Sequence, residues 1–104
     1  MQENRDSTMN REEARVAMME QLRRRDVEGA KNIVIIDSET IEKPYGWIFY
    51  YDSRRYLETG DIRYKIFGHG PVVVIAATGE IIELGSARPS EEFIKELEEE
   101  RHLL

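Results

Sequence analysis

The chain has 104 residues, of which 40% are hydrophobic and 35% are charged, as is typical of one globular domain with a single modest core. It contains no cysteine, which excludes disulfide bridges, thiolate nucleophiles, zinc–thiolate sites and iron–sulfur clusters, and which fits the reducing cytoplasm where we expect the protein to lie. The formal net charge of −6 argues against a nucleic-acid partner, and the absence of an apolar run approaching roughly 18 residues argues against a membrane span.

The N-terminal part of the chain predicts a flexible tail followed by a helix. Residues 1–9 are polar and lack the apolar stretch of a secretory signal. Asn10 has the character of an N-cap, and Glu13 lies three residues further on, as a capping box requires. The apolar spacing that follows predicts a helix over Arg11–Arg25. We therefore expect a tail at residues 1–9 and a single domain over residues 10–104.

The middle of the chain predicts a pair of antiparallel strands. Residues 33–36 are β-branched, which favours a strand, and this strand continues in more polar form up to residue 42. Residues 43–46 carry turn chemistry. Residues 47–51 then predict a second strand, and the short link makes the pair antiparallel.

A hairpin is predicted in the second half, from residues 72–77 and 80–85. A two-residue loop places Ile75 opposite Ile82 and Val73 opposite Leu84, with all four on one face. A bulged turn shifts this register by one residue, and the sequence leaves that alternative open.

The last element is a helix that begins with Pro89 at its first position. Its apolar stripe contains Phe93, Ile94 and Leu97, whereas residues 98–100 are glutamates that we expect to face water. The order α-β-β-β-β-α predicts an α+β fold, in which a four-stranded, mostly antiparallel sheet carries the N-terminal and C-terminal helices on one face.

The segment from Ser53 to Gly70 is too long for a simple connection, so it indicates a short helix or a functional loop. It is rich in tyrosine and arginine, which are enriched in binding hot spots, and it is basic within an acidic chain. One interpretation is that it contacts a partner. The other is that its apolar side chains cover one end of the sheet while the charges are solvated.

No motif in the chain predicts catalysis. The two histidines, His69 and His102, have no metal-ligand spacing, and the serines occupy turn or helix-start positions. The chain has no nucleophile elbow and no phosphate-binding loop. We therefore expect no enzyme activity, no metal and no cofactor.

Three stretches together resemble a known family pattern. They are GWIFYYDSRRYLETGD at residues 46–61, GPVVVIAATGEIIELGSARP at residues 70–89 and EEFIKELE at residues 91–98. With NREEAR at the start of the first helix, the chain resembles the immunity protein 35 (YrhB-like) family over about residues 10–98. The motif glycines, aromatics and proline map onto positions that we interpret as structural: Gly46, Trp47, Phe49, Gly60, Gly70, Pro71, Gly79 and Gly85.

The resemblance implies an immunity protein of a bacterial polymorphic toxin system. Such a protein is cytoplasmic, is encoded beside a toxin and neutralises it by tight binding, without catalytic residues. The alternative is a stand-alone adaptor or chaperone-like binding domain without a toxin partner. The oligomeric state stays open, because an exposed edge strand can also pair two chains.

A specific complex buries about 800 Å² on each partner. Two parts of the chain offer such a surface. The first is acidic and follows the first strand; the second is the basic segment before Gly70. The candidate partner-binding residues are Asp37, Glu39 and Glu42 in the first, and Arg54, Arg55, Tyr56, Glu58, Asp61 and Tyr64 in the second.

Overall fold

The computed structural model describes residues 8–25 and 32–104. The first helix, α1, spans Arg11–Arg25, as its sequence predicts. The capping box is formed: the Glu13 N–H donates to Asn10 Oδ1 at 2.8 Å, and the Asn10 N–H donates to Glu13 Oε1 at 2.9 Å. Most of the expected tail, residues 1–7, lies outside the described residues. Met9 packs against the core and donates its N–H to the Ala76 carbonyl at 3.3 Å.

All described strand pairs are antiparallel, and they form two sheets. The larger sheet has the order β2-β3-β5-β6. Its strands are β2 (Ile41–Lys43), β3 (Gly46–Phe49), β5 (Val72–Ile75) and β6 (Ile81–Glu83). The smaller ladder pairs β1 (Ile33–Ile35) with β4 (Tyr51–Ser53).

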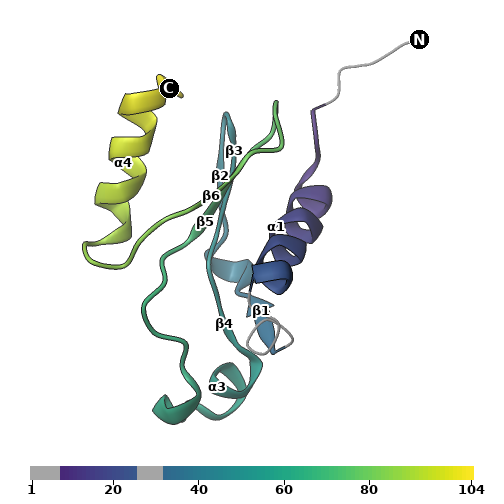
Figure 1. Ribbon diagram of the computed structural model, residues 1–104, viewed down its shortest axis with the longest axis vertical. Coiled ribbons are helices and arrows are strands. Elements are labelled where there is room, and N and C mark those ends of the chain that lie inside the picture. The colour runs from purple at the N-terminus through teal and green to yellow at the C-terminus, as the bar shows by residue number, and fades with distance from the viewer. Residues whose placement is uncertain (1–7, 26–31) are drawn as a thin grey trace.

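The predicted first pair of strands is one long hairpin with an interruption. The 3₁₀ helix η1 (Asp37–Glu39) separates β1 from β2, and β3 runs almost directly into β4. The hydrogen bond from the Ile36 N–H to the Tyr50 carbonyl, at 2.8 Å, keeps the two halves in register. Consequently β1 and β4 extend beyond the larger sheet as a two-stranded ribbon, which carries the segment after β4 to the lower end of the molecule in Figure 1.

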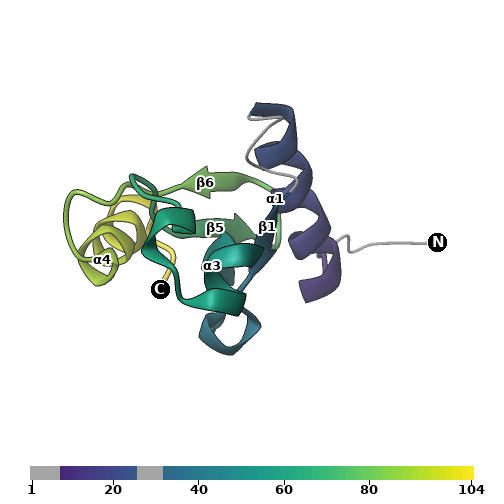
Figure 2. The same cartoon turned by 90° about the horizontal axis from the view of Figure 1, so that it is seen from below.

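The α+β class, the four-stranded antiparallel sheet and the two terminal helices are confirmed. The helices, however, lie on opposite faces of the sheet, and not on one face as the sequence analysis expects. Figure 1 and Figure 2 both show α1 on one side of the strands and α4 (Ser90–Arg101) on the other.

The reason lies in the central strands, which are apolar on both faces. Phe49 and Val74 pack with α1 residues such as Met18, whereas Ile48 and Val73 belong to the cluster that contains Ile94 and Leu97 of α4. Successive strand residues point to opposite faces. A continuous apolar run such as VVVI therefore needs a cover on each side, as in strands buried on both faces.

The β5–β6 hairpin has a longer turn than the predicted two-residue loop. Val73 lies opposite Ile82, so the register differs by two residues from the expected one. The Gly79 N–H donates to the Ile75 carbonyl at 2.8 Å, and Gly79 has a φ of 77°, which closes a four-residue turn over residues 76–79. A shift of two residues preserves the face of each side chain, so Ile75 and Ile82 still lie in the α4 cluster.

Helix α4 begins one residue later than predicted, because Pro89 is the N-cap and Ser90 the first helical residue. Ile94 and Leu97 are its buried residues. Glu98 does not face water: its Oε2 accepts hydrogen bonds from the Tyr45 hydroxyl at 2.7 Å and lies 3.0 Å from Lys43 Nζ. Burial, followed by the bond to Glu98, raises the pKa of Tyr45. This polar clamp fixes α4 to the β2–β3 turn.

Candidate functional site

The segment from Ser53 to Gly70 contains two short helices, α3 (Arg54–Thr59) and η2 (Ile62–Tyr64). Ser53 is the N-cap of α3, since its hydroxyl accepts from the Tyr56 N–H at 2.9 Å. Gly60 ends α3 in the left-handed conformation, with a φ of 72°, which a residue with a side chain rarely adopts. The Asp61 carboxylate then caps η2 by accepting from the Arg63 N–H at 3.0 Å. Local capping chemistry therefore builds this segment.

A buried carboxylate on β4 attaches the segment to the sheet. Asp52 is only 3% exposed. Its Oδ1 accepts from the backbone N–H groups of Ser53 and Ile66, at 2.8 and 2.9 Å, and its Oδ2 lies 2.8 Å from Lys65 Nζ. Burial alone would raise the pKa of Asp52, but the Lys65 and backbone hydrogen bonds outweigh it and lower that pKa. Asp52 thus stays ionised and fixes residues 65–66 to β4.

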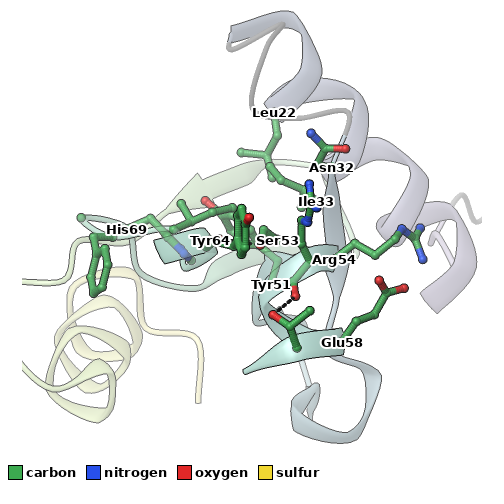
Figure 3. A pocket seen from close by; sticks show the side chains of 14 residues that line it. Leu22, Asn32, Ile33, Tyr51, Ser53, Arg54, Glu58, Tyr64 and His69 are labelled. Atoms are coloured by element: carbon green, nitrogen blue, oxygen red, sulfur yellow. Dashed lines mark hydrogen bonds between the residues drawn. The ribbon is translucent and has the colours of Figure 1, made fainter. Parts of the chain in front are cut away.

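Between this segment, β4 and the end of α1 lies a pocket of about 820 Å³ (Figure 3). Its lining mixes apolar and charged side chains. Tyr51 and His69 stack in its wall, with ring centroids 4.1 Å apart. Leu22 and Ile33 contribute apolar surface from α1 and β1. Arg54 and other polar side chains of α3 lie at its border. A concave, mainly preformed site with a few polar groups is typical of binding surfaces.

Three large apolar side chains of the same segment are exposed to solvent, and one of them, Phe67, also lines the pocket. Phe67 is 69% exposed, Ile62 is 59% exposed and Leu57 is 43% exposed. Beside them, the guanidinium groups of Arg55 and Arg63 lie 4.7 and 5.7 Å from the centroid of the Tyr64 ring. We call this surface the α3–η2 face, and it consists of Arg54, Arg55, Leu57, Glu58, Ile62, Arg63, Tyr64, Phe67 and His69.

The structure brings some of the expected basic-segment residues together. The pocket lining contains Arg54, Arg55, Glu58 and Tyr64. Tyr56 lies apart from it, with Lys65 Nζ 4.7 Å from its ring centroid. The Asp61 carboxylate already has a partner within the chain, because the Arg63 guanidinium donates to both of its oxygens. These hydrogen bonds lower the pKa of Asp61.

The acidic candidates lie outside the pocket lining, on η1 and β2. Asp37 is already paired, since Arg15 approaches its carboxylate oxygens at 3.3 Å. Glu39 lies close enough to Lys65 to raise the pKa of that lysine, after the larger effect of the bond to Asp52. Glu42 is exposed on the edge strand β2, opposite Trp47. The three carboxylates therefore offer less free negative charge than the sequence indicates.

The motif residues occupy positions in the frame of the fold. Trp47 and Phe49 lie in the α1 core, and Pro71 is buried before β5. A Cβ at Gly46 would lie 1.9 Å from the Val74 carbonyl oxygen. One at Gly70 would lie 2.1 Å from that of Gly85. These two glycines are needed because backbones pass each other there.

Sequence reasoning missed several residues of the face, notably Leu57, Ile62, Phe67 and His69. The interpretation in which apolar side chains cover one end of the sheet assigned Leu57 and Phe67 to that role, and His69 was considered only as a metal or catalytic candidate. In residues 61–66 single charged residues alternate with apolar or aromatic ones, and this alternation is the signal that some of these side chains are left exposed.

The described residues contain no group of three or more His, Cys, Asp or Glu side chains that could hold a metal ion. In the same ranges, no helix is both long and apolar enough to cross a membrane.

Comparison with known proteins supplies the family. The chain is similar to YrhB of Escherichia coli (strain K12), an uncharacterized protein, with 40% identity over 53 residues; the match spans 51% of this chain and 56% of YrhB. No solved structure matches the chain significantly. The family model described as immunity protein 35 matches residues 12–96, which include all six described strands, α1 except its first residue and the first half of α4. The chain therefore belongs to the immunity protein 35 family.

Proposed function

We propose that this chain is an immunity protein that binds a cognate bacterial toxin in the cytoplasm and neutralises it through the α3–η2 face. Family membership supports the class of function. The observation that carries the choice of surface is the exposure of Phe67, Ile62 and Leu57 beside an arginine–tyrosine cluster.

This combination suits protein recognition. Large apolar side chains supply binding energy when a partner buries them, and arginine and tyrosine are the residues most enriched among hot spots. Phe67 is 69% exposed and belongs to neither core cluster, so the fold does not use it for its own packing. The chain keeps this face in place rigidly, through Asp52 and Ser53, whose hydroxyl also donates to the Tyr64 carbonyl.

Rigidity matters because a preformed surface loses little entropy on binding. Neutralisation then needs no chemistry from this chain: covering the toxin's active site, or a surface it needs, is sufficient.

The test is a growth assay with the cognate toxin, which we expect to be encoded beside this chain. We expect bacteria that express the toxin alone to stop growing, and bacteria that also express this chain to grow and to yield a stable complex in a pull-down. Growth arrest that persists with well-folded immunity protein present, together with no complex, would contradict the proposal and favour the stand-alone adaptor.

A further inference from the structure

Among the strands that the structure describes, none pairs with the outer edge of β1. In the β1–β4 ladder, Val34 lies opposite Asp52, and Ile33 and Ile35 lie opposite Ser53 and Tyr51. Beyond the two ends of the ladder, the Arg54 N–H donates to the Asn32 carbonyl at 2.7 Å, and the Ile36 N–H donates to the Tyr50 carbonyl at 2.8 Å. Hydrogen-bonded and non-hydrogen-bonded pairs alternate along an antiparallel ladder. The bonds to β4 therefore come from residues 32, 34 and 36.

It follows that Ile33 and Ile35 direct their backbone N–H and C=O groups away from β4. In the part of the chain that the structure describes, no other residue forms a hydrogen bond with these groups. Ile35, backbone included, is only 6% exposed, so the strand itself is held in the core. The result is a fixed edge with unpaired donors and acceptors at the spacing of an extended chain.

A groove of about 260 Å³ lies along this edge and is lined by residues of α1 and β1. Val16, which is 48% exposed, and Met19 provide its apolar wall. Arg15 lines the groove but is paired with Glu12 and Asp37. Arg23 and Arg54 also line it, and neither side chain forms an ion pair within residues 8–25 and 32–104.

We propose that an extended segment of the toxin, carrying an acidic side chain, adds as a strand to the outer edge of β1 and lies in this groove. The inference rests on the proposed function and specifies how the partner docks. The unpaired groups of Ile33 and Ile35 are satisfied by an extended backbone, which is the mode of recognition called strand addition. The two arginines select an acidic side chain, because they form charge-assisted bonds with carboxylates.

The position of the groove supports a single continuous interface. Arg54 and Ile33 line both this groove and the pocket beside α3. A partner bound to the α3–η2 face can therefore also contact the edge of β1 through one continuous surface. A second copy of this chain is a poorer occupant, because it brings the same excess of arginine to the edge and like charges repel.

Amide hydrogen exchange tests the proposal directly. The probe is the neighbouring toxin with an inactivating substitution, added to the full chain. In the free protein we expect the Ile33 and Ile35 amides to exchange faster than those of Val34 and Ile36. In the complex, the exchange of the first two should slow by about tenfold or more, while the other two change little.

Charge-reversal variants provide the second measurement. Arg23→Glu should weaken the toxin complex by about tenfold or more, because an unpaired arginine becomes a repelling carboxylate. Arg24→Glu makes the same charge change on the same helix but outside the groove, and it should leave affinity within about threefold. Ile33→Pro removes one outward N–H and leaves the amides that form hydrogen bonds with β4. Its unfolding midpoint is measured first, to establish that the variant folds, and its affinity for the toxin is compared afterwards.

The outcomes separate the two proposals. A stable complex with unchanged exchange at Ile33 and Ile35, or equal affinities of the Arg23 and Arg24 variants, overturns strand addition and leaves the immunity function standing. No complex and no rescue of growth overturns the immunity function, and with it the toxin as occupant. If the Ile33 and Ile35 amides are protected without toxin, and this protection increases with the concentration of the free chain, the occupant is a second copy. That result also overturns the proposal.

Discussion

Asp52 is the residue on which the geometry of the α3–η2 face depends most. It is nearly inaccessible, and it accepts hydrogen bonds from the Ile66 N–H and from Lys65, which lie more than a dozen residues later in the chain. Without these bonds, residues 65–67 lose their attachment to β4. The exposed position of Phe67 is therefore a consequence of a carboxylate that is itself hidden.

Replacing Asp52 with asparagine should lower the free energy of unfolding by about 1–3 kcal/mol, since the charge-assisted bond to Lys65 is lost while an acceptor for Ile66 remains. Urea unfolding of the wild type and the variant measures this difference. Glu99→Gln, a substitution of an exposed carboxylate on α4, is the matched control and should change stability by less than about 0.5 kcal/mol. Equal stabilities of the Asp52 variant and the wild type would contradict this role.

The same residue predicts how stability depends on pH. The pKa of Asp52 is lower in the folded protein than its ordinary value of 3.8. Its contribution is therefore fully present above that ordinary pKa and is lost as the pH falls through the lower, folded-state pKa. Between about pH 5 and pH 2, the wild type should lose more unfolding free energy than Asp52→Asn, because only the wild type must protonate this group. If the unfolding free energies of the wild type and of Asp52→Asn changed equally with pH, Asp52 would not be the source of this pH dependence.

At the scale of elements, α4 covers one face of the sheet through a small apolar contact. Ile94 and Leu97 are its buried side chains, and the Tyr45–Glu98–Lys43 clamp adds polar contacts at its C-terminal half. It lies on the far side of the sheet from α1 and away from α3 (Figure 1). Helix α4 should therefore stabilise the fold without contacting the toxin.

Leu97→Ala should cost about 2–4 kcal/mol of unfolding free energy, because a buried side chain leaves a cavity between α4 and the sheet. Thermal and urea unfolding give this value. The affinity of the folded variant for the toxin should stay within about threefold of the wild type, since the change lies on the other face. A large loss of affinity at a temperature where the variant is folded would place part of the interface on α4.

The elements differ in how far sequence alone defines them. Helix α1 has its signals within itself, from the Asn10–Glu13 capping box to the apolar spacing, so its bounds are predictable. The position of α4 is not predictable in this way, because it depends on which face of β3 and β5 remains uncovered once α1 has packed. The runs WIF and VVVI carry that information, since an apolar strand without alternation needs cover on both faces.

The candidate site was predictable only as a segment. Its length, its arginines and its tyrosines identified residues 53–70, and Ser53, Gly60 and Asp61 have recognisable capping chemistry. Which apolar side chains stay exposed depends on the long-range bond between Asp52 and Ile66, which no local pattern encodes. The unpaired edge of β1 likewise depends on the strand order, because among the described strands β1 and β2 form the outer arm of the long hairpin and each pairs on one side only.

On the scale of the whole molecule, charge is unevenly distributed. The chain has a net charge of −6, and exposed glutamates line α4. The segment with α3, at the other end of the molecule in Figure 1, carries Arg54, Arg55 and Arg63. A toxin surface that meets the arginine end should therefore be acidic. The glutamates of α4 should repel the same acidic partner, so it should not bind at that end of the molecule.

This distribution predicts a salt-dependent complex. Raising the salt concentration from about 0.05 to 0.5 M should weaken toxin binding by about tenfold, because attraction between exposed charges is screened. Calorimetric titration at several salt concentrations measures the slope. Arg55→Glu should bind more weakly and show a flatter slope, whereas an unchanged slope would exclude the arginine end from the interface.

The measurement that tests the central claim most directly combines affinity and growth protection for one double variant, Ile62→Ser with Phe67→Ser. Both side chains are exposed in the free protein, so folding should be preserved, but toxin affinity should fall by about tenfold to a hundredfold and growth protection should be lost. Leu104→Ser, which removes an equally exposed apolar side chain elsewhere, should retain both. Full protection and wild-type affinity in the double variant would contradict the assignment of the α3–η2 face as the toxin-binding surface.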